Sequence, residues 1–433
     1  MSEFWRVTLA LLVGLLVSGT LGWYVARRTA WAFSLPKRAR TMLLALLMLG
    51  LVAAVIARLL GRPYAALAAV LGQVGGAVML AIVISALLLV PVELGRAIAS
   101  LFRSFASSRA RGRAATLRTR ADGSPSTPAR SETEPLAATL ASAADARSDA
   151  TPSTPARREF IAQIAAGSAV SLGFGAAIYG TWVGRRDYTV ETVPIKLAKL
   201  PRALDGLTIV QLSDLHVGTY VSERELSAAL QLVRDAKPDL IVLTGDLLDH
   251  DVSYAPMLAR FARSLSGLAR HGVHAIPGNH DYYAGAAAVM QALREAGTDV
   301  LLNRHVRIGQ GSAALILAGL DDVQAPRFDS AGPRLDLAFD GLDEQLPRVL
   351  LSHNPSYFRH AHALADLTLS GHTHGGQITM FINPAELVLR HGFVRGHYSY
   401  EGSQLYVNRG FGTAGPPARI GSAPEITRLV LHV

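Results

Sequence analysis

The chain has 433 residues, too many for one ordinary domain, and half of them are apolar, which is high for a wholly soluble protein. Residues 1–120 carry 15 Lys/Arg against 2 Asp/Glu, whereas residues 188–433 carry 21 against 24, so the net charge of +9 gives no indication of nucleic-acid binding. The absence of cysteine excludes disulfides, thiol nucleophiles and thiolate-bound zinc.

Four apolar stretches predict membrane-spanning helices. They cover residues 7–26, 41–57, 64–92 and, more mildly apolar, 160–183. The alternative for any one of them is a buried core helix or a signal peptide, but an uncharged apolar run of this length is rarely soluble core. We therefore expect residues 1–95 to hold three spans and residues 160–183 the fourth.

Basic residues predict the orientation of these spans. Five of them lie between residues 27 and 40, and seven arginines with no acid follow the third span between residues 96 and 120. The positive-inside rule places both segments in the cytoplasm of a cell membrane, and everything after the fourth span on its outer, periplasmic side. We expect residues 96–159 to form a basic and then Ala/Ser/Pro-rich cytoplasmic linker.

The linker ends in Arg157-Arg158-Glu159-Phe160-Ile161, directly before the fourth span. This looks like a twin-arginine export signal, here internal rather than N-terminal. The alternative, which stays open, is that the two arginines only anchor a helix at the inner membrane surface.

From residue 188 onward, short apolar runs alternate with helical stretches, which predicts a soluble α/β domain over residues 188–433. The runs cover residues 207–212, 240–243, 273–276, 314–317, 348–351 and 367–369, with 405–407 and 426–432 closing the chain. Helices are expected over residues 222–236, 255–269 and 285–295, the first opened by Ser222 and Glu225 as a capping box.

Five of the apolar runs end in clusters of Asp, His and Asn. The clusters are Asp214-Leu215-His216, Gly245-Asp246-Leu247-Leu248-Asp249, Gly278-Asn279-His280-Asp281, Ser352-His353-Asn354 and Gly371-His372-Thr373-His374. Loops at strand ends gather ligands in α/β folds, and side chains two residues apart in an extended segment face the same way. A single strand-end Asp is more often a helix cap, but five clusters in this order predict one shared site.

At these residues the sequence resembles the calcineurin-like metallophosphoesterases, whose Asp-x-His, GDxxD, GNH[DE], lone His and GHxH motifs are all present. The run GHTHGGQ, residues 371–377, and residues 406–415 resemble a membrane-linked, often twin-arginine-exported bacterial subgroup. The resemblance covers residues 207–433. It implies an α/β fold in which a two-sheet β-sandwich is flanked by helices and carries metals at its strand ends, here preceded by an N-terminal helical transmembrane region.

Carried over residue by residue, the resemblance implies two divalent metal ions. One would be held by Asp214, His216, Asp246 and His374, and the other by Asp246, Asn279, His353 and His372, with Asp246 as the bridge. Such donors suit Mn²⁺, Fe²⁺ or Zn²⁺ better than Ca²⁺ or Mg²⁺.

In the family, a hydroxide that bridges the two ions attacks phosphorus, and His280 lies beside the leaving group, so Asp246 and His280 are the expected catalytic residues. We expect Asp249 and Asp281 to orient imidazoles, with ordinary loop acids as the open alternative. Arg390, Arg395 and Arg419 are expected on a solvated face.

Two classes of function follow. The first is a membrane-anchored phosphoesterase that hydrolyses phosphate esters or pyrophosphates of a membrane-associated, lipid-linked substrate. UDP-diacylglucosamine hydrolases use this fold, but their substrate lies in the cytoplasm, against the expected topology. The second is a non-enzymatic membrane module with an inactive phosphoesterase-like domain, which is less favoured because none of the seven ligands is missing. The sequence indicates neither the substrate nor the oligomeric state.

Overall fold

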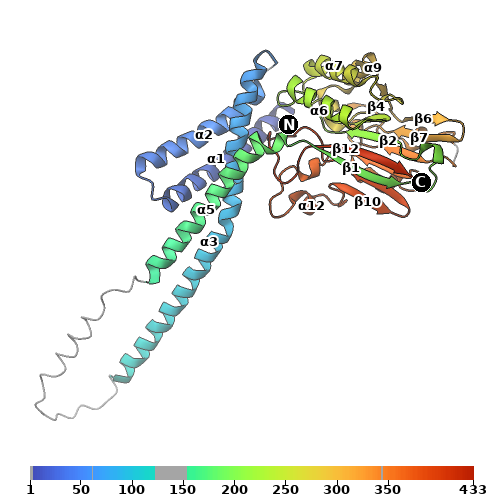
Figure 1. Cartoon of the computed structure of the whole chain (residues 1–433). Coiled ribbons are helices and arrows are strands. Elements are labelled where there is room, and N and C mark those ends of the chain that lie inside the picture. The colour runs from blue at the N-terminus through green and yellow to red at the C-terminus, as the bar shows by residue number, and fades with distance from the viewer. Residues whose placement is uncertain (1–2, 61, 122–153, 343–344) are drawn as a thin grey trace, which may run out of the picture. The chain divides into compact units, whose positions relative to one another are not determined.

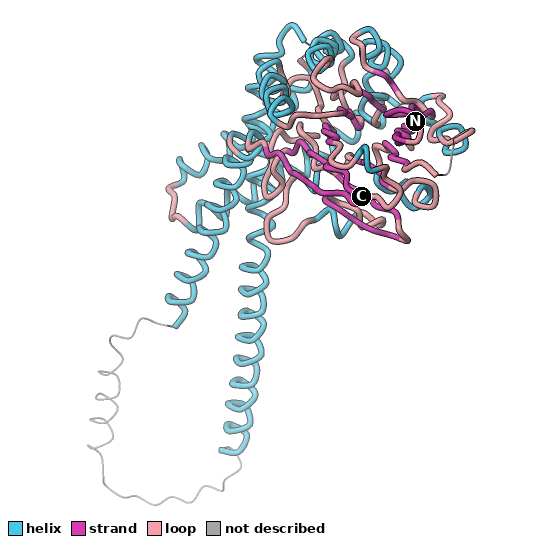
Figure 2. The backbone as a smooth tube through the Cα atoms, turned by 45° about the vertical axis from the view of Figure 1, so that its right-hand side comes forward, coloured by secondary structure: helices cyan, strands magenta, loops and turns pink. Residues whose placement is uncertain are grey.

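The computed structural model describes residues 3–60, 62–121, 154–342 and 345–433 (Figures 1 and 2). These residues form two compact units, one of Met1–Met48 with Ala81–Gly175 and the other of Leu49–Leu80 with Ala176–Val433. The middle of the predicted linker, residues 122–153, lies outside the described residues.

Four long helices occupy the predicted membrane region. They are α1 (Glu3–Ala32), α2 (Lys37–Leu59), α3 (Ala65–Ala121) and α5 (Thr154–Trp182). Among the described residues, three stretches are long and apolar enough to cross a membrane, namely Lys37–Leu59, Ala65–Phe102 and Arg157–Arg186. They coincide with the second, third and fourth predicted spans. The first predicted span lies within α1, and its crossing of a membrane stays a prediction.

Helix α3 continues beyond its apolar part, so the basic start of the predicted linker is helical as far as Ala121. Within the first unit, Arg28 and Glu93 form an ion pair of 2.6 Å, and the guanidinium of Arg96 lies 4.4 Å from the centre of the Trp31 ring. Charged groups close to a bilayer are costly unless paired, so these contacts hold α1 and α3 together.

The second unit contains two six-stranded sheets, with strand orders β1-β12-β2-β3-β4-β5 and β10-β11-β9-β8-β7-β6. The strands are β1 (Thr189–Lys196), β2 (Thr208–Leu212), β3 (Leu240–Thr244), β4 (Val273–Ile276), β5 (Asp299–Val300), β6 (Arg304–Gln310), β7 (Ala313–Gly319), β8 (Arg348–Leu351), β9 (Leu367–Ser370), β10 (Gly396–Tyr400), β11 (Ser403–Val407) and β12 (Glu425–His432). All eight predicted strands are present, together with four more.

The two sheets face each other across an apolar interior. Alternate residues of a strand point to opposite faces, so Ile209 of β2 packs with Leu317 and Leu369 of the other sheet, whereas Val210 packs under helices. The helices over the first sheet are α6 (Glu223–Asp235), α7 (Ala255–Leu265) and α9 (Ala286–Glu295), and the short α10 (Leu335–Ala338) and α11 (Phe358–Ala361) cover the second. The predicted two-sheet sandwich flanked by helices is confirmed.

Strand direction explains where the polar clusters meet. Strands β2, β3 and β4 run parallel in one sheet, and β7, β8 and β9 run parallel in the other. The carboxyl ends of parallel strands lie at one edge of a sheet, so the loops that follow them converge there. The predicted capping box also forms at the start of α6, where the amide of Ser222 donates to the Glu225 carboxylate at 3.1 Å.

Candidate metal centre

The first group of predicted ligands comes from the loops after β2 and β9. Asp214, His216 and His374 are buried, and their ligand atoms lie within 4.8 Å of one another. The Nε2 atoms of His216 and His374 face each other at 3.1 Å, and Nε2 of His374 lies 3.4 Å from Oδ1 of Asp214. We call these three residues the Asp214 cluster.

The second group comes from the loops after β3, β8 and β9. Asp246, His353 and His372 also have ligand atoms within 4.8 Å of one another, and we call them the Asp246 cluster. Nε2 of His353 lies 3.2 Å from Oδ2 of Asp246 and 3.3 Å from Nδ1 of His372. Because the Thr244 carbonyl can only accept, His353 donates to it from Nδ1 at 2.8 Å and keeps Nε2 directed into the site.

Asp246 lies between the two clusters. Its Oδ2 is 3.2 Å from His353 and 3.7 Å from Nε2 of His216, which belongs to the other cluster. Its Oδ1 accepts a hydrogen bond of 2.7 Å from the amide of His280, which fixes the plane of the carboxylate. This placement is the one that a bridging ligand requires.

The backbone of the site is held in an uncommon conformation. Five of the seven predicted ligands, Asp214, His216, Asp246, His372 and His374, have φ between 48° and 74°. Each such left-handed residue costs about 1–3 kcal/mol and persists only where its surroundings determine it. Glycines make room beside them, since a Cβ at Gly278 would collide with Asp246 and a Cβ at Gly371 with Asp214.

His280 stands at the edge of the two clusters. Its Nδ1 donates to the Asp249 carbonyl at 2.9 Å, so Nε2 is the nitrogen that can meet a substrate. The Asp249 carboxylate lies 3.5 Å from Nδ1 of His280 and 3.6 Å from Nδ1 of His216, which has no hydrogen-bond partner among the described residues, so the orienting role of Asp249 stays a prediction. Burial alone would lower the pKa of His280, but the hydrogen bonds to Asp249 and the charge of Asp246 raise it to about 9.

Asp281 has a different role from the one predicted. Its carboxylate accepts from the amides of Gly278, Leu247 and Leu248 at 2.9–3.0 Å, so it joins two ligand loops through their main chains and does not orient an imidazole. Burial, with the nearby charge of Asp246, raises the pKa of Asp281 to about 7.

The donor set fits two borderline divalent ions. Burial lowers the pKa of His372 to about 4 and that of His374 well below its usual value, which leaves both imidazoles neutral with a lone pair. Oδ1 of Asn279 is buried and has no hydrogen-bond partner among the described residues. Burial alone would lower the pKa of His353, but the charge of Asp246 raises it well above its usual value, so a cation at this site would take the place of the His353 proton. The imidazoles of His372 and His374 and an unpartnered amide oxygen beside two carboxylates are what a cation would satisfy. The residues are brought together as predicted, and their role as ligands stays a prediction.

Comparisons with known proteins identify the family. The calcineurin-like phosphoesterase family matches residues 207–376. A metallophosphoesterase of Aquifex aeolicus is 32% identical over 260 residues, which cover 60% of this chain and 95% of that protein. YkuE of Bacillus subtilis, also described as a metallophosphoesterase, is 32% identical over 280 residues, covering 62% and 96%. The chain belongs to the metallophosphoesterase family.

A third relative is a protein of Danio rerio named as a transmembrane protein with metallophosphoesterase domain. It is 35% identical over 266 residues, 59% of this chain, and the match spans only 60% of the relative's own length. The three apolar helices of this metallophosphoesterase, together with that relative, support association with a membrane.

Two buried residues beside the metallophosphoesterase site were not predicted. Arg419 was expected on a solvated face, but it is fully buried and donates to the carbonyls of Gly410 and Gly412 at 2.6–2.9 Å. Its NH2 group lies 3.2 Å from Nδ1 of His374, and burial lowers its pKa to about 10. Asp322, at the end of β7, is also buried, and burial raises its pKa. A strand-end acid after residues 314–317 was a signal for Asp322, whereas nothing in the sequence indicated Arg419.

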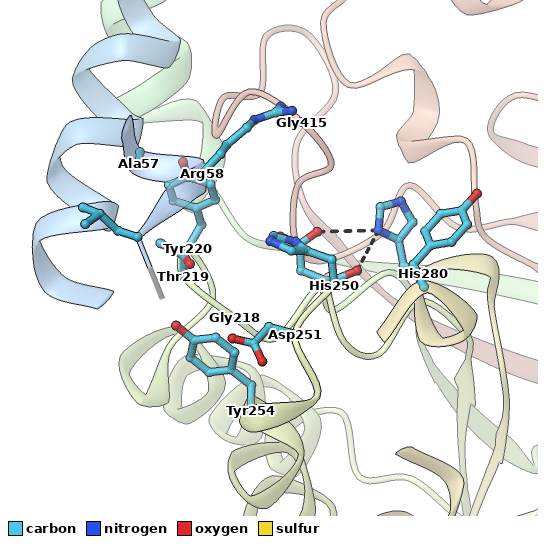
Figure 3. Close-up of a pocket in the computed structure, with 13 residues that line it drawn as sticks. Ala57, Arg58, Gly218, Thr219, Tyr220, His250, Asp251, Tyr254, His280 and Gly415 are labelled. Atoms are coloured by element: carbon cyan, nitrogen blue, oxygen red, sulfur yellow. Dashed lines mark hydrogen bonds and ion pairs between the residues drawn. The ribbon is translucent and has the colours of Figure 1, made fainter. Parts of the chain in front are cut away.

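A cavity of about 500 Å³ opens beside His280, wholly within the second unit (Figure 3). One wall carries His280, and the ring of Tyr283, which also lines the cavity, lies 5.2 Å from the His280 ring. The opposite wall carries Ala57 and Arg58, from the C-terminal end of α2, and the phenol of Tyr220 lies next to them. The cavity therefore lies between His280 and the end of a helix that is apolar enough to span a membrane.

Proposed function

We propose that this protein is a phosphoesterase that uses two divalent ions, Mn²⁺, Fe²⁺ or Zn²⁺, to hydrolyse phosphate esters or pyrophosphates of a membrane-associated substrate. The observation that carries the proposal is the pair of ligand clusters that meet at Asp246. All seven ligand positions of the family pattern are occupied by the expected residue types, which argues against an inactive domain.

Two bound ions would neutralise the phosphoryl oxygens and lower the pKa of a water molecule to about 7. The chain's own residues orient the reaction. The amide of His280 holds the Asp246 carboxylate in place, and the Asp249 carbonyl holds the His280 ring with Nε2 free to donate a proton to the leaving oxygen. The left-handed ligand residues keep this arrangement rigid before any substrate binds.

The cavity beside His280 supports a lipid substrate. A leaving group next to His280 would extend into the cavity and toward Ala57 and Arg58 at the end of α2. Because α2 is a candidate span, its end marks where lipid headgroups would lie, and Arg58 offers a positive charge there. Phospholipids, isoprenoid phosphates and lipid-linked nucleotides share this combination of phosphate and acyl or prenyl chains.

The test compares matched substrates on the full chain, purified in detergent and loaded with Mn²⁺. Dioleoyl phosphatidic acid and glycerol 3-phosphate contain the same phosphomonoester with and without acyl chains, and a lipid pyrophosphate and a phosphodiester complete the set. We expect EDTA-sensitive hydrolysis and a higher kcat/KM for the acylated member of the pair. Equal kcat/KM values would remove the lipid part of the proposal, and a protein with two bound ions that hydrolyses nothing would be the inactive module.

We also propose that the chain is a multi-pass protein of the inner membrane with its catalytic domain outside the cytoplasm, because of the arginines between residues 96 and 120. An alkaline phosphatase reporter fused after Arg186 should then be active, and one fused after Arg120 inactive. The opposite result would invert the orientation, and a lipid pyrophosphate hydrolase of the UDP-diacylglucosamine type facing the cytoplasm would become the better proposal.

Export by a twin-arginine route is a separate proposal. Arg157 and Arg158 are both exposed near the start of α5. Replacing both by lysine keeps the positive charge but should prevent twin-arginine recognition, so the domain should no longer reach the outside. Normal delivery of the Lys-Lys variant would show that the pair only anchors the helix.

A further inference from the structure

An exposed apolar loop follows the predicted ligands His372 and His374. Its side chains include Phe381, which is 82% exposed, Ile382 at 65%, Leu387 at 77% and Val388 at 75%. Residues 380–388, which we call the apolar loop, place these large side chains in solvent within nine positions of the chain. Contiguous exposed apolar surface of this kind marks a site of interaction.

The apolar loop is a built structure. It contains the short helix α12 (Pro384–Val388), whose cap residue Asn383 is buried and accepts a hydrogen bond of 3.2 Å from the amide of Ala385. The Asn383 amide group also donates to Glu386 at 3.2 Å. These contacts hold the turn in one conformation while none of the residues of α12 is buried. The exposure of the apolar side chains is therefore imposed by the local fold.

The start of the apolar loop is tied to the end of a candidate membrane span. The amide of Thr379 donates to the carbonyl of Ile420 at 2.7 Å, and the next residue back, Arg419, donates from its amide to the carbonyl of Gly180 in α5 at 3.0 Å. Gly180 lies so close to Ile420 that an added Cβ would contact its side chain at 2.6 Å. Thr379, the residue before the apolar loop, is therefore bonded to a segment, Arg419–Ile420, that packs on the last turns of α5. These turns belong to the candidate span Arg157–Arg186.

We propose that the apolar loop inserts into the interface of the bilayer that α5 crosses. Its attachment to α5 keeps it close to that bilayer, which favours lipid over a protein partner. The charges agree with this occupant, because Arg390 and Arg395 are exposed directly after the loop and can meet lipid phosphates. The acid of the loop, Glu386, is hydrogen-bonded to Asn383. Membrane binding of such segments grows with buried apolar area and with basic residues at the headgroups.

The natural absence of cysteine allows a direct test in the full chain. Phe381→Cys is labelled with an environment-sensitive fluorophore, and the protein is placed in nanodiscs with and without nitroxide-labelled lipid. The matched control is Leu337→Cys, which is 49% exposed on α10. Helix α10 packs on β6, where the Ala338 carbonyl faces His305, at the opposite edge of the second sheet from β10. The proposal does not depend on any enzymatic activity.

We expect blue-shifted emission at position 381 and a several-fold decrease in its intensity with nitroxide lipid, and neither change at position 337. The same result with Val388→Cys would show that the effect belongs to the loop and not to a distortion at one residue. Equal quenching at 381 and 337 would overturn the proposal. A blue shift without lipid quenching would mean that protein covers the loop, and this result would overturn it as well.

Discussion

The Asp214 and Asp246 clusters contain the same residue types but are supported by different parts of the chain. In the Asp246 cluster, main-chain groups orient the ligands, namely the Thr244 carbonyl at His353 and the His280 amide at Asp246. In the Asp214 cluster, the His372 amide holds the Asp214 carboxylate in the same way, but the two histidines have charged side chains beside them, Arg419 next to His374 and Asp249 at 3.6 Å from His216. Main-chain support survives most substitutions, whereas side-chain support does not, so we expect the Asp214 cluster to be the more easily weakened half of the centre.

The largest effect should come from the residue that both clusters share. Asp246→Asn removes the charge between His216 and His353, and we expect both ions to be lost. The value of kcat should fall by more than about 10³-fold, which exceeds the usual cost of removing one electrostatic donor from an active site. Metal content per chain and turnover of a soluble phosphate ester measure both effects. A variant that keeps two ions and normal turnover would refute the two-metal centre.

The next largest effect is expected at His280, where a substitution separates metal binding from proton transfer. His280→Ala removes a group that neither cluster includes as a ligand, so both ions should remain while kcat falls by roughly 10²-fold, as for other general acids. The loss should be smaller for p-nitrophenyl esters, whose leaving group needs little protonation. If good and poor leaving groups lose equally, His280 positions the substrate and does not protonate it.

Substitution of Arg419 tests whether the two clusters are supported by different parts of the chain. Arg419→Lys cannot donate to the Gly410, Gly412 and His374 carbonyls together, so the loops that carry Asp214 and His374 should loosen and metal affinity of the Asp214 cluster should fall about 10–100-fold, as when other groups that position ligands are removed. Titration with Mn²⁺ should then show one tight and one weakened site.

The matched control for this titration is Arg428→Lys. Arg428 lies on β12 and donates to the Ala236 carbonyl at 3.1 Å, away from both clusters. It should keep two tight sites. Equal weakening of both sites in Arg419→Lys would show that the two clusters are not independently supported.

The smallest expected effect is on the stability of the domain and comes from Glu225, which belongs to neither cluster. Glu225→Gln weakens the capping box of α6 and should destabilise the domain by about 1 kcal/mol without changing metal content. Burial alone would raise the pKa of Glu225, but the hydrogen bonds from Ser222 lower it overall. The folded state therefore binds its proton less tightly than the unfolded state, so this stabilisation is present at neutral pH and is lost as the pH falls below the ordinary Glu range. Thermal unfolding at pH 7 and pH 4 should show a larger difference between variant and parent at pH 7.

The sequence predicted the interior of both sheets but not their borders. The eight predicted strands are central, and the four that were missed, β1, β5, β6 and β10, are the outermost strands of the two sheets. Outermost strands are covered on fewer sides and carry alternating exposed residues, as in β1 and β10, so they show no continuous apolar run. Strand β5 has only two residues, too few for any pattern.

In the site, too, positions set by the neighbouring sequence were predictable, whereas positions set by contacts with distant parts of the chain were not. The ligand positions were predictable because each follows its own strand in the chain. Arg419 was not, because its burial depends on carbonyls at residues 410 and 412 and on a helix more than two hundred residues earlier. Asp281 was expected either to orient an imidazole or to be an ordinary loop acid, yet only the folded arrangement of the loops shows that it holds main-chain amides.

Arg419 also links the candidate membrane span α5 to the candidate metal centre. Its amide donates to the Gly180 carbonyl of α5, and its guanidinium lies against His374, so a single residue connects α5 to a predicted ligand. A displacement of α5 would therefore reach the loop of residues 371–377, which contributes His374 to one cluster and His372 to the other. A fragment cut after α5 would lose the hydrogen bond to Gly180, so we expect the isolated domain to bind metal differently from the full chain.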